Sequence, residues 1–404
     1  MVIILKKSKD LDNLIKQSDK PIAFVLGKYI TTGLGVIRCL GRCGVPVIWL
    51  DSTQKQIGFS SKYCNGINCP NPRYNEKEYA DFLLRIGERL NHKGVLFPIG
   101  DIEVISLLKN KSMLEKFYQF PMADLDVTNK LLNKQLFYKI LKKLNIDHPK
   151  TYFPKDKSDL KSISTEITYP CIIKPSYSAL FVVDFKTKLF FAQNSKQLIQ
   201  SYERAHSKKH NVMIQDIIPG SAKNMHGFNA YYDRNINPNG VFMYRRIREW
   251  PLVKGNGCFI QSVKISKLED TINQLIKKIK YHGILDAEIK KDPRDNRFKL
   301  IEINPRCWMQ ISFPARCKAN LPHIAYLDAI GKKFEKPIST RENVKWLNMT
   351  EDINSSMKSI LKRDLSIFEW IKSYKGEKEY AIFAKDDPMP FLLSFLPFYL
   401  QNKQ

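Results

Sequence analysis

Carboxylate and amide side chains alternate with apolar residues on two short segments near residue 300. Asp286 and Glu288 are two residues apart on the first segment, and Glu302 and Asn304 have the same spacing on the second. Successive side chains of a strand point to opposite faces, and a proline-containing turn between the segments predicts a hairpin, so these groups share one space. Carboxylate and amide oxygens without histidine are typical of Mg²⁺ bound together with phosphate. The alternative is a solvated outer face, or pairing of the two glutamates with nearby lysines.

Basic side chains supply the opposite charge. Arg306 follows Asn304 by two residues, which places positive and negative charges at one strand end. Lys174 closes an apolar segment over residues 170–175, where an ammonium is costly without an anionic partner, and a phosphate is a natural one. Lys134 lies on an expected amphipathic helix over residues 128–145, where a surface lysine is the default interpretation.

Length and composition limit the class of protein. The chain has 404 residues, which predicts two or three domains, and 66 Lys+Arg against 40 Asp+Glu give a net charge of +26. A hydrophobic fraction of 43% excludes a disordered chain, and the length excludes a small disulfide scaffold. The eight cysteines form no CxxC pair and no zinc-ligand spacing, so a reduced, cytoplasmic protein is expected.

The elements that must position these groups begin with a βαβ unit over residues 21–51. We expect a strand at residues 22–26, a turn from Gly27 to Gly35, a helix from Val36, and a second strand at residues 45–51. Such a turn lies over the carboxyl ends of the strands, where open α/β sheets bind ligands. Its glycines do not have the GxGxxG spacing, which argues against a dinucleotide. Further along, strands predominate from residue 170 onward.

At this point the chain resembles the ATP-grasp carboxylate–amine ligases, the group that includes the D-aspartate ligases. The resemblance implies an α/β and α+β multidomain protein, with a Rossmann-like domain followed by the two-lobed ATP-grasp fold. It implies four parts: a Rossmann-like domain over 1–125, a linking helix and central lobe over 126–210, a C-terminal lobe with the metal site over 211–335, and a C-terminal extension over 336–404. The resemblance rests on an ordered set of segments: Gly27…Gly33-Leu34-Gly35, Leu96-Phe97-Pro98, Asn133-Lys134, Ile172-Ile173-Lys174-Pro175, Ile214-Gln215-Asp216-Ile217-Ile218-Pro219-Gly220, Asp286-Ala287-Glu288-Ile289-Lys290, Glu302-Ile303-Asn304-Pro305-Arg306 and Asp386-Asp387-Pro388-Met389-Pro390.

The resemblance also implies roles for individual residues. The residues expected to bind ATP are Lys134, Lys174, Ser178, Gln215, Asp216, Ile217 and Ile218. Those expected to hold Mg²⁺ or Mn²⁺ are Glu288, Glu302 and Asn304, with Lys174 and Arg306 as catalytic residues. The expected substrate-binding residues are Gly33, Gly35, Arg248 and Arg306, with packing of Arg248 on Trp250 as the alternative.

The implied activity joins a carboxylate, expected to be an amino acid, to an amine through an acyl phosphate formed with ATP. A carboxylase-type ATP-grasp enzyme and a basic protein that binds nucleic acid or a membrane surface without turnover are the alternatives, although no specific nucleic-acid motif is present. The high charge is compatible with an acidic or lipid-linked precursor as substrate, and a homodimer is compatible with the resemblance. The apolar segment 389–400 either docks into the core or contacts the inner membrane face peripherally.

Overall fold

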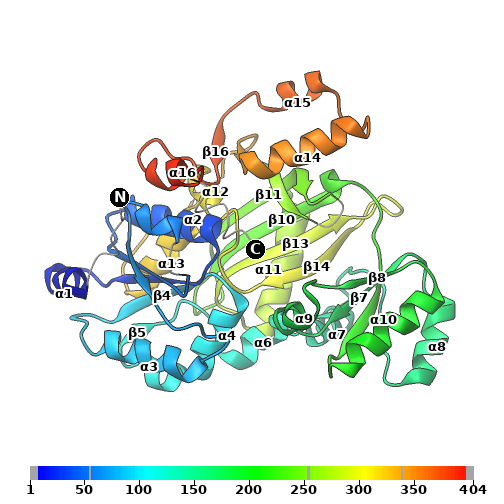
Figure 1. The fold of residues 1–404 in the computed structure, drawn as a ribbon, viewed down its shortest axis with the longest axis horizontal. Helices are drawn as coiled ribbons and strands as arrows, with labels where there is room; N and C mark the ends of the chain where they lie inside the picture. The colour runs from blue at the N-terminus through cyan, green and yellow to red at the C-terminus, as the bar shows by residue number, and fades with distance from the viewer. Residues whose placement is uncertain (1–7, 54–55, 253–254, 338–339, 397–404) are drawn as a thin grey trace.

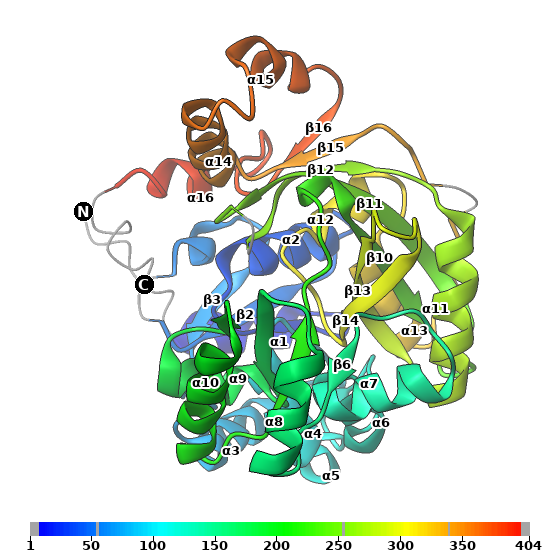
Figure 2. The same ribbon diagram turned by 90° about the vertical axis from the view of Figure 1, so that its right-hand side faces the viewer.

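The computed structural model describes residues 8–53, 56–252, 255–337 and 340–396, which form three β-sheets with their covering helices. In Figure 1 the N-terminal domain lies on the left, a large sheet crosses the centre, and a smaller lobe lies at the lower right. Figure 2, turned by 90°, brings α8 and α10 of the smaller lobe to the front.

The N-terminal domain is a parallel sheet in the order β3-β2-β1-β4-β5, with helices on both faces. Alternate side chains of the central strands enter two different cores, one against α2 and the other against α3 and α4. The elements are α1 (Ser8–Gln17), β1 (Ala23–Leu26), α2 (Ile30–Gly41), β2 (Val47–Asp51), β3 (Asn65–Asn68), α3 (Glu76–Gly87), β4 (Gly94–Pro98), α4 (Asp101–Lys109), α5 (Lys111–Leu114) and β5 (Tyr118–Gln119). The strand order reverses direction between β1 and β4, and such a switch point opens a crevice at the carboxyl ends of the strands.

The predicted glycine turn is shorter than expected, because α2 already begins at Ile30. Gly33 and Gly35 therefore lie inside a helix. A Cβ on Gly33 would lie 2.1 Å from the Trp49 ring, and one on Gly35 would lie 2.6 Å from Ile311. The two glycines serve close packing, and the structure does not bring them to the cavity described below, which corrects their expected place in a substrate-binding turn.

The helix predicted over residues 128–145 is two helices, α6 (Leu125–Leu132) and α7 (Lys134–Lys143). Asn133 between them has an extended backbone, and its side chain accepts hydrogen bonds from the N–H groups of Gln135 and Leu136. An asparagine cap of this kind starts a new helix at the following residue. The break thereby places Lys134 in the first turn of α7, where its N–H donates to the Ser176 carbonyl at 3.0 Å.

The smaller lobe is built on a four-stranded antiparallel sheet in the order β6-β9-β7-β8. Its elements are β6 (Thr151–Tyr152), α8 (Lys157–Glu166), β7 (Cys171–Pro175), α9 (Ser178–Phe185), β8 (Phe190–Ala192), α10 (Ser195–Ser207) and β9 (Val212–Asp216). β9 pairs with β7 in this sheet, although residue 211 was expected to open the next lobe.

The large sheet has seven strands in the order β14-β13-β10-β11-β12-β15-β16, and α11 packs on one face. Its strands are β10 (Met225–Tyr232), β11 (Pro238–Trp250), β12 (Asn256–Ser262), β13 (Gly283–Lys291), β14 (Phe298–Asn304), β15 (Lys345–Leu347) and β16 (Lys378–Tyr380). The helices of this part are α11 (Ser266–Ile279), α12 (Ser312–Arg316), α13 (Leu321–Ala329), α14 (Met349–Leu361), α15 (Ile367–Ser373) and α16 (Met389–Leu393). The C-terminal extension thus supplies two strands of the sheet.

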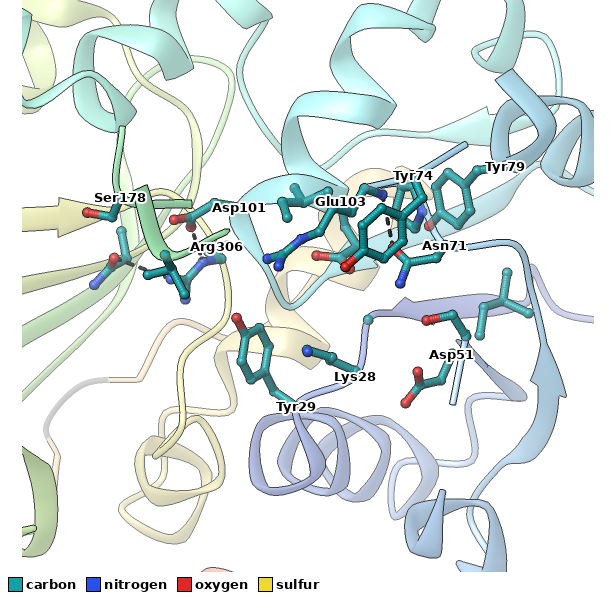
Figure 3. Close-up of a pocket in the computed structure, with 18 of the residues that line it drawn as sticks. Lys28, Tyr29, Asp51, Asn71, Tyr74, Tyr79, Asp101, Glu103, Ser178 and Arg306 are labelled. Carbon is teal, nitrogen blue, oxygen red and sulfur yellow. Dashed lines mark hydrogen bonds and ion pairs between the residues drawn. The ribbon is translucent and has the colours of Figure 1, made fainter. Parts of the chain in front are cut away.

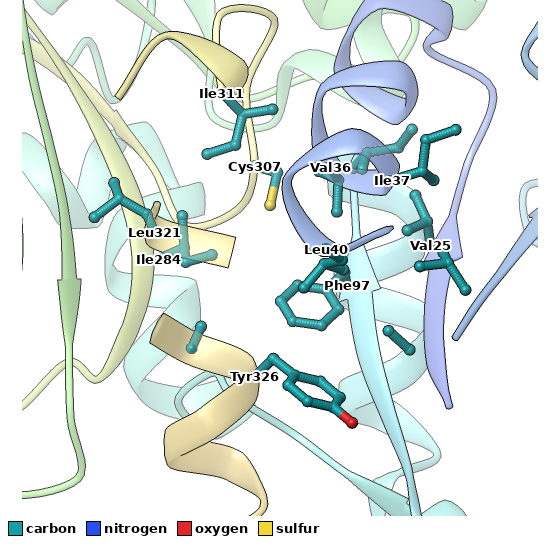
Figure 4. Close-up of a cluster of buried hydrophobic side chains, with 14 of the residues drawn as sticks. Val25, Val36, Ile37, Leu40, Phe97, Ile284, Cys307, Ile311, Leu321 and Tyr326 are labelled. Carbon is teal, nitrogen blue, oxygen red and sulfur yellow. The ribbon is translucent and has the colours of Figure 1, made fainter. Parts of the chain in front are cut away.

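A shared apolar core joins the N-terminal domain to the C-terminal half of the chain. Val36 and Leu40 of α2 belong to the same buried cluster as Ile311 and Leu321 (Figure 4). Asp387, near the end of the chain, also contacts the N-terminal domain. Its carboxylate is buried there. Among the described residues, no helix is long and apolar enough to cross a membrane.

Within the described residues, the segment 389–396 docks on the rest of the protein only in part, and its expected alternative, peripheral membrane contact, stays a prediction. Leu393 of α16 is buried, whereas Leu392, Phe395 and Leu396 are exposed. Residues 397–400 lie outside the described part of the chain.

Candidate functional site

A cavity of about 230 Å³ lies where the N-terminal sheet meets the predicted hairpin (Figure 3). Its N-terminal wall includes Gly27 after β1 and the start of α4 after β4, so it opens at the switch point of the parallel sheet. The lining also includes five residues that the sequence predicted as site residues: Lys134, Ser178, Glu302, Asn304 and Arg306. Residues from three separate parts of the chain therefore meet at one place.

The predicted hairpin of acidic residues is confirmed by the pairing of β13 with β14. Asp286 lies opposite Asn304, and Glu288 lies opposite Glu302. The two carboxylates of the second pair are consequently neighbours across the strands. The alternation of apolar and polar residues predicted the hairpin and the shared space, but not the register, which shifts between Glu288 and Ile289.

Glu302 is held by two lysines from the linking helix and the smaller lobe. Its carboxylate lies 2.6 Å from Lys134 Nζ, and Lys134, followed by Lys174, holds the pKa of Glu302 well below its usual range. Burial and the neighbouring Lys134 lower the pKa of Lys174 to about 8. Two ammonium groups thus lie near Glu302 and Glu288, and a bound polyanion would add to the negative charge around them.

Glu288 is paired with an arginine that sequence reasoning missed. Arg246 Nη2 lies 2.9 Å from Glu288, and the guanidinium also reaches Glu249 at 3.3 Å. Its neighbour Arg248, expected to bind substrate, instead forms a two-pronged pair with buried Asp352 at 2.6 and 3.0 Å and lies over the Phe259 ring. The register of β11 shifts between these two arginines, so simple alternation does not carry both into one space. The structure thus corrects the expectation for Arg248, which does not line the cavity.

A chain of polar contacts connects the hairpin to the N-terminal domain. Asn229 and Asn304 both donate to buried Asp286, at 2.7 and 3.0 Å. The oxygen of Asn304 accepts from Arg306 Nη2 at 3.4 Å, and Arg306 Nε lies 2.5 Å from Asp101 at the start of α4. Burial and the nearby Glu288 raise the pKa of Asp286 to about 7. Arg306 is therefore fixed between the two domains, with its guanidinium at the cavity wall.

Glu103 is a second acidic residue of α4 that the sequence analysis did not select. Its carboxylate lies over two glycines, where a Cβ on Gly27 would lie 3.2 Å from Cδ and one on Gly100 would lie 2.2 Å from Oε2. Burial raises its pKa to about 7, outweighing the opposite effect of Arg306. Figure 3 shows Lys28 and Tyr29 directed toward the same space. Carboxylates directly after a strand of a parallel sheet were a usable signal, because ligands bind at that edge.

The remaining predicted residues lie around this centre. Ser178 begins α9 and lines the cavity. Gln215 is buried and donates to Thr151 at 2.8 Å, and Asp216 ends β9. The Ile218 carbonyl accepts from Lys290 at 2.8 Å. The segment from Gln215 to Ile218 thus connects the two lobes, although none of its residues lines the cavity.

The donor set of the hairpin fits a divalent cation. Within the described residues, no three His, Cys, Asp or Glu side chains are grouped to hold a metal ion. Mg²⁺, however, is bound through one or two carboxylates together with phosphate oxygens and water. Glu288 and Glu302 are two such carboxylates, and each already has a cationic side chain against it. Positive charge is therefore accommodated at both positions.

Replacing Glu103 by glutamine is expected to stabilise the protein at pH 8 but not at pH 4.5. The pKa of Glu103 is raised from 4.5 to about 7 on folding, so the folded state binds the proton more tightly than the unfolded state. Stability contributed by this proton is full below pH 4.5 and is lost as the pH rises to about 7. Melting temperatures of the two proteins at both pH values provide the measurement. Replacement of the exposed Glu115 by glutamine is the control, and an equal melting-temperature difference at the two pH values for Glu103→Gln would contradict the expectation.

No protein-family profile matches the sequence. A D-aspartate ligase of Enterococcus faecium (strain Aus0004) is 27% identical over 275 residues, 64% of each chain, so the match spans less than two thirds of that relative.

Solved structures resemble the fold at low sequence identity. The biotin carboxylase domain of Hydrogenobacter thermophilus 2-oxoglutarate carboxylase, solved with MgADP, ADP and bicarbonate, has a TM-score of 0.59 and 16% identity over 80% of this chain and 73% of its own. L-amino acid ligase from Bacillus licheniformis has a TM-score of 0.60 and 12% identity over 80% of this chain and 78% of its own. The parallel N-terminal sheet and the two mainly antiparallel sheets match the fold of these structures. The chain therefore shares the fold of these structures, which agrees with the fold class that the resemblance predicted.

Proposed function

We propose that this protein is an ATP-dependent ligase that joins a carboxylate to an amine. The observation that carries the proposal is the convergence of Lys134, Glu302 and Arg306 on one cavity at the switch point of the N-terminal sheet. The similarity to a D-aspartate ligase and to an L-amino acid ligase supports a carbon–nitrogen bond as the product. The first reaction is attack of the substrate carboxylate on the γ-phosphoryl group, which gives an acyl phosphate and ADP. The amine then displaces phosphate from the acyl carbon.

The chain's own residues supply charge neutralisation and positioning for these steps. Lys134 and Lys174 contact the phosphates, with Ser178 at the start of α9 beside them, and the segment from Gln215 to Ile218 receives the adenine. Burial and Lys134 lower the pKa of Lys174, and a bound polyanion would favour its charged form. Arg306, held by Asp101, faces the reacting carboxylate and the transferred phosphoryl group. Preorganised cations of this kind stabilise charge that develops in the transition state.

Glu288, Glu302 and Asn304 are the residues that would hold Mg²⁺. The metal supplies neutralisation of the phosphate charge when it is bound. The carboxylates of this set keep Lys134 and Arg246 in place at the cavity side of the hairpin.

The acid substrate is proposed to be an amino acid. The cavity wall carries both signs, with the cations Lys28 and Arg73 and the acidic residues Asp51, Asp101 and Glu103. A zwitterion matches such a wall better than a simple monocarboxylate, because both of its charges find a partner. Glu103, a half-buried residue that lines the cavity, is the proposed partner of the ammonium group.

The test is ADP release from MgATP with a panel of amino acids and simple carboxylates, with hydroxylamine present to trap an acyl phosphate. We expect ADP and hydroxamate to form together, with one class of amino acid and with little product in its absence. ADP formation that depends on bicarbonate and on no other acid would contradict the proposal and favour a carboxylase. Absence of both nucleotide binding and turnover would contradict the nucleotide site itself.

A further inference from the structure

Helix α14 buries polar residues and exposes apolar ones, unlike an ordinary surface helix. Its buried side consists of Asp352, Ser355 and Ser356, which face β11 and β12. Asp352 is neutralised there by Arg248. A surface helix normally buries its apolar stripe and exposes its polar one. Here the polar stripe faces the protein, which leaves the apolar stripe outside.

The exposed stripe of α14 is regular and long. Met349, Ile353, Met357 and Leu361 follow one another at intervals of four residues, and all are exposed, Leu361 to 82%. Residues four apart lie on the same side of a helix. Large apolar surfaces of this kind on a folded protein mark sites of interaction.

The next helix also carries exposed apolar residues. Ile367, Phe368 and Ile371 of α15 are exposed, Phe368 to 74% and Ile371 to 63%. They too are spaced for one side of a helix. In both ribbon views α14 and α15 lie together at one extremity of the molecule, beyond the outer strands of the large sheet (Figures 1 and 2). We refer to the seven exposed apolar residues of these two helices as the α14–α15 surface.

Basic residues outnumber acidic ones slightly around the α14–α15 surface. The segment 349–375 carries five basic residues, Lys358, Lys362, Arg363, Lys372 and Lys375, against four acidic ones. Of the acidic residues, Asp352 is buried against Arg248, and Glu369 caps the start of α15 through Ser366. Lys345 and Lys378 donate to backbone carbonyls within residues 373–376 and add two further charges at the edge.

We propose that the α14–α15 surface docks on an anionic lipid membrane. Apolar side chains on short helices with lysine and arginine around them are suited to the boundary between headgroups and acyl chains, where the apolar groups enter and the basic groups meet anionic phosphates. A second copy of this chain is a poorer partner, because two molecules of net charge +26 repel one another. The surface binds the lipid bilayer without spanning it.

Sedimentation with lipid vesicles tests the proposal. The full-length protein is mixed with vesicles of phosphatidylcholine, or of phosphatidylcholine with about a third phosphatidylglycerol, at low and high salt. We expect binding to the anionic vesicles only, with a bound fraction that falls as salt screens the attraction. Equal binding to both lipids, or none to the anionic vesicles, would overturn the proposal.

Two double variants and a matched control locate the contact. Phe368→Glu/Ile371→Glu removes apolar contacts, and Lys362→Glu/Lys372→Glu reverses basic charges. Each is expected to weaken partitioning about tenfold or more. Met113→Glu alters an exposed apolar residue of the N-terminal domain and should bind as the unaltered protein does. Undiminished binding of either double variant would contradict the assignment of the surface.

Analytical ultracentrifugation of the unaltered protein and the Phe368→Glu/Ile371→Glu variant tests whether a second copy of this chain covers the surface. A dimer that this variant dissociates would assign the surface to a second copy and overturn the membrane proposal. A monomer, or a dimer that the variant leaves intact, is the expected result. Lipid binding requires neither ATP nor an acid substrate, so these outcomes are independent of the ligase proposal.

Discussion

Glu302→Gln is expected to lower the rate of ADP formation by about 10²- to 10³-fold, the usual cost of removing one preorganised charge from a site of this kind. The change is nearly isosteric, so it removes charge with little change of volume. Glu302 has Lys134 at 2.6 Å and lies opposite Glu288 across the hairpin. Neutralising it takes away one metal-binding carboxylate and leaves a buried ammonium without its partner.

The measurement is steady-state ADP release at saturating MgATP and acid substrate, together with the melting temperature of each variant. Glu203→Gln is the matched control. Glu203 lies in the smaller lobe, away from the cavity, and forms an exposed ion pair with Lys157 at 3.0 Å. Lys174→Ala should resemble Glu302→Gln in losing ADP formation. Turnover at the unaltered rate in a folded Glu302→Gln protein would contradict the site assignment.

Asp387→Asn is expected to destabilise the protein by about 3–5 kcal/mol, the typical cost of breaking a buried ion pair from one side. Asp387 Oδ2 lies 2.9 Å from Arg38 Nε, and both side chains are almost fully buried. The same carboxylate accepts from the Ser61 hydroxyl at 2.7 Å and from the Lys62 N–H at 3.0 Å. The change would leave the Arg38 guanidinium in the interior without a counter-charge.

The adjacent residue offers a control for this expectation. Asp386 pairs with Arg42 at 2.8 Å, but both side chains are more than one third exposed. Asp386→Asn should therefore cost about 1 kcal/mol or less. Urea unfolding of the two variants, monitored by fluorescence and by circular dichroism, compares them. Similar losses for the two changes would show that burial does not set the strength of the Asp387 contact.

Local patterns predicted most of the elements that carry the site, because their signals lie within a few residues. The apolar run before Gly27, the alternation around Glu288 and Glu302, and the apolar run before Lys174 each correspond to a strand of the structure. β1 and β7 are apolar runs, and β13 and β14 alternate around their acidic residues, so each signal is local.

Features that depend on distant partners were not predictable in this way. The Gly33 position is explained only by Trp49, which lies on the next strand, and the break at Asn133 only by the cap that it forms. Arg246 and Arg248 are two residues apart, so strand alternation alone would place them on one face. A register shift between them instead brings Arg246 to Glu288 and Arg248 to Asp352. The roles of the predicted ATP and metal residues stay predictions until the ligand experiments are made.

The shared core between the two halves has a consequence for biosynthesis. The α2 residues Val36 and Leu40 are covered by Ile311 and Leu321, which leave the ribosome more than 270 residues later. At a translation rate of about 5–20 residues per second, this apolar helix face stays exposed for roughly 15 to 50 seconds before the residues that cover it are made. The nascent N-terminal domain thus exposes an apolar surface that is prone to aggregate throughout that interval. The yield of folded protein in the cell therefore depends on the speed of translation and on chaperones that cover α2.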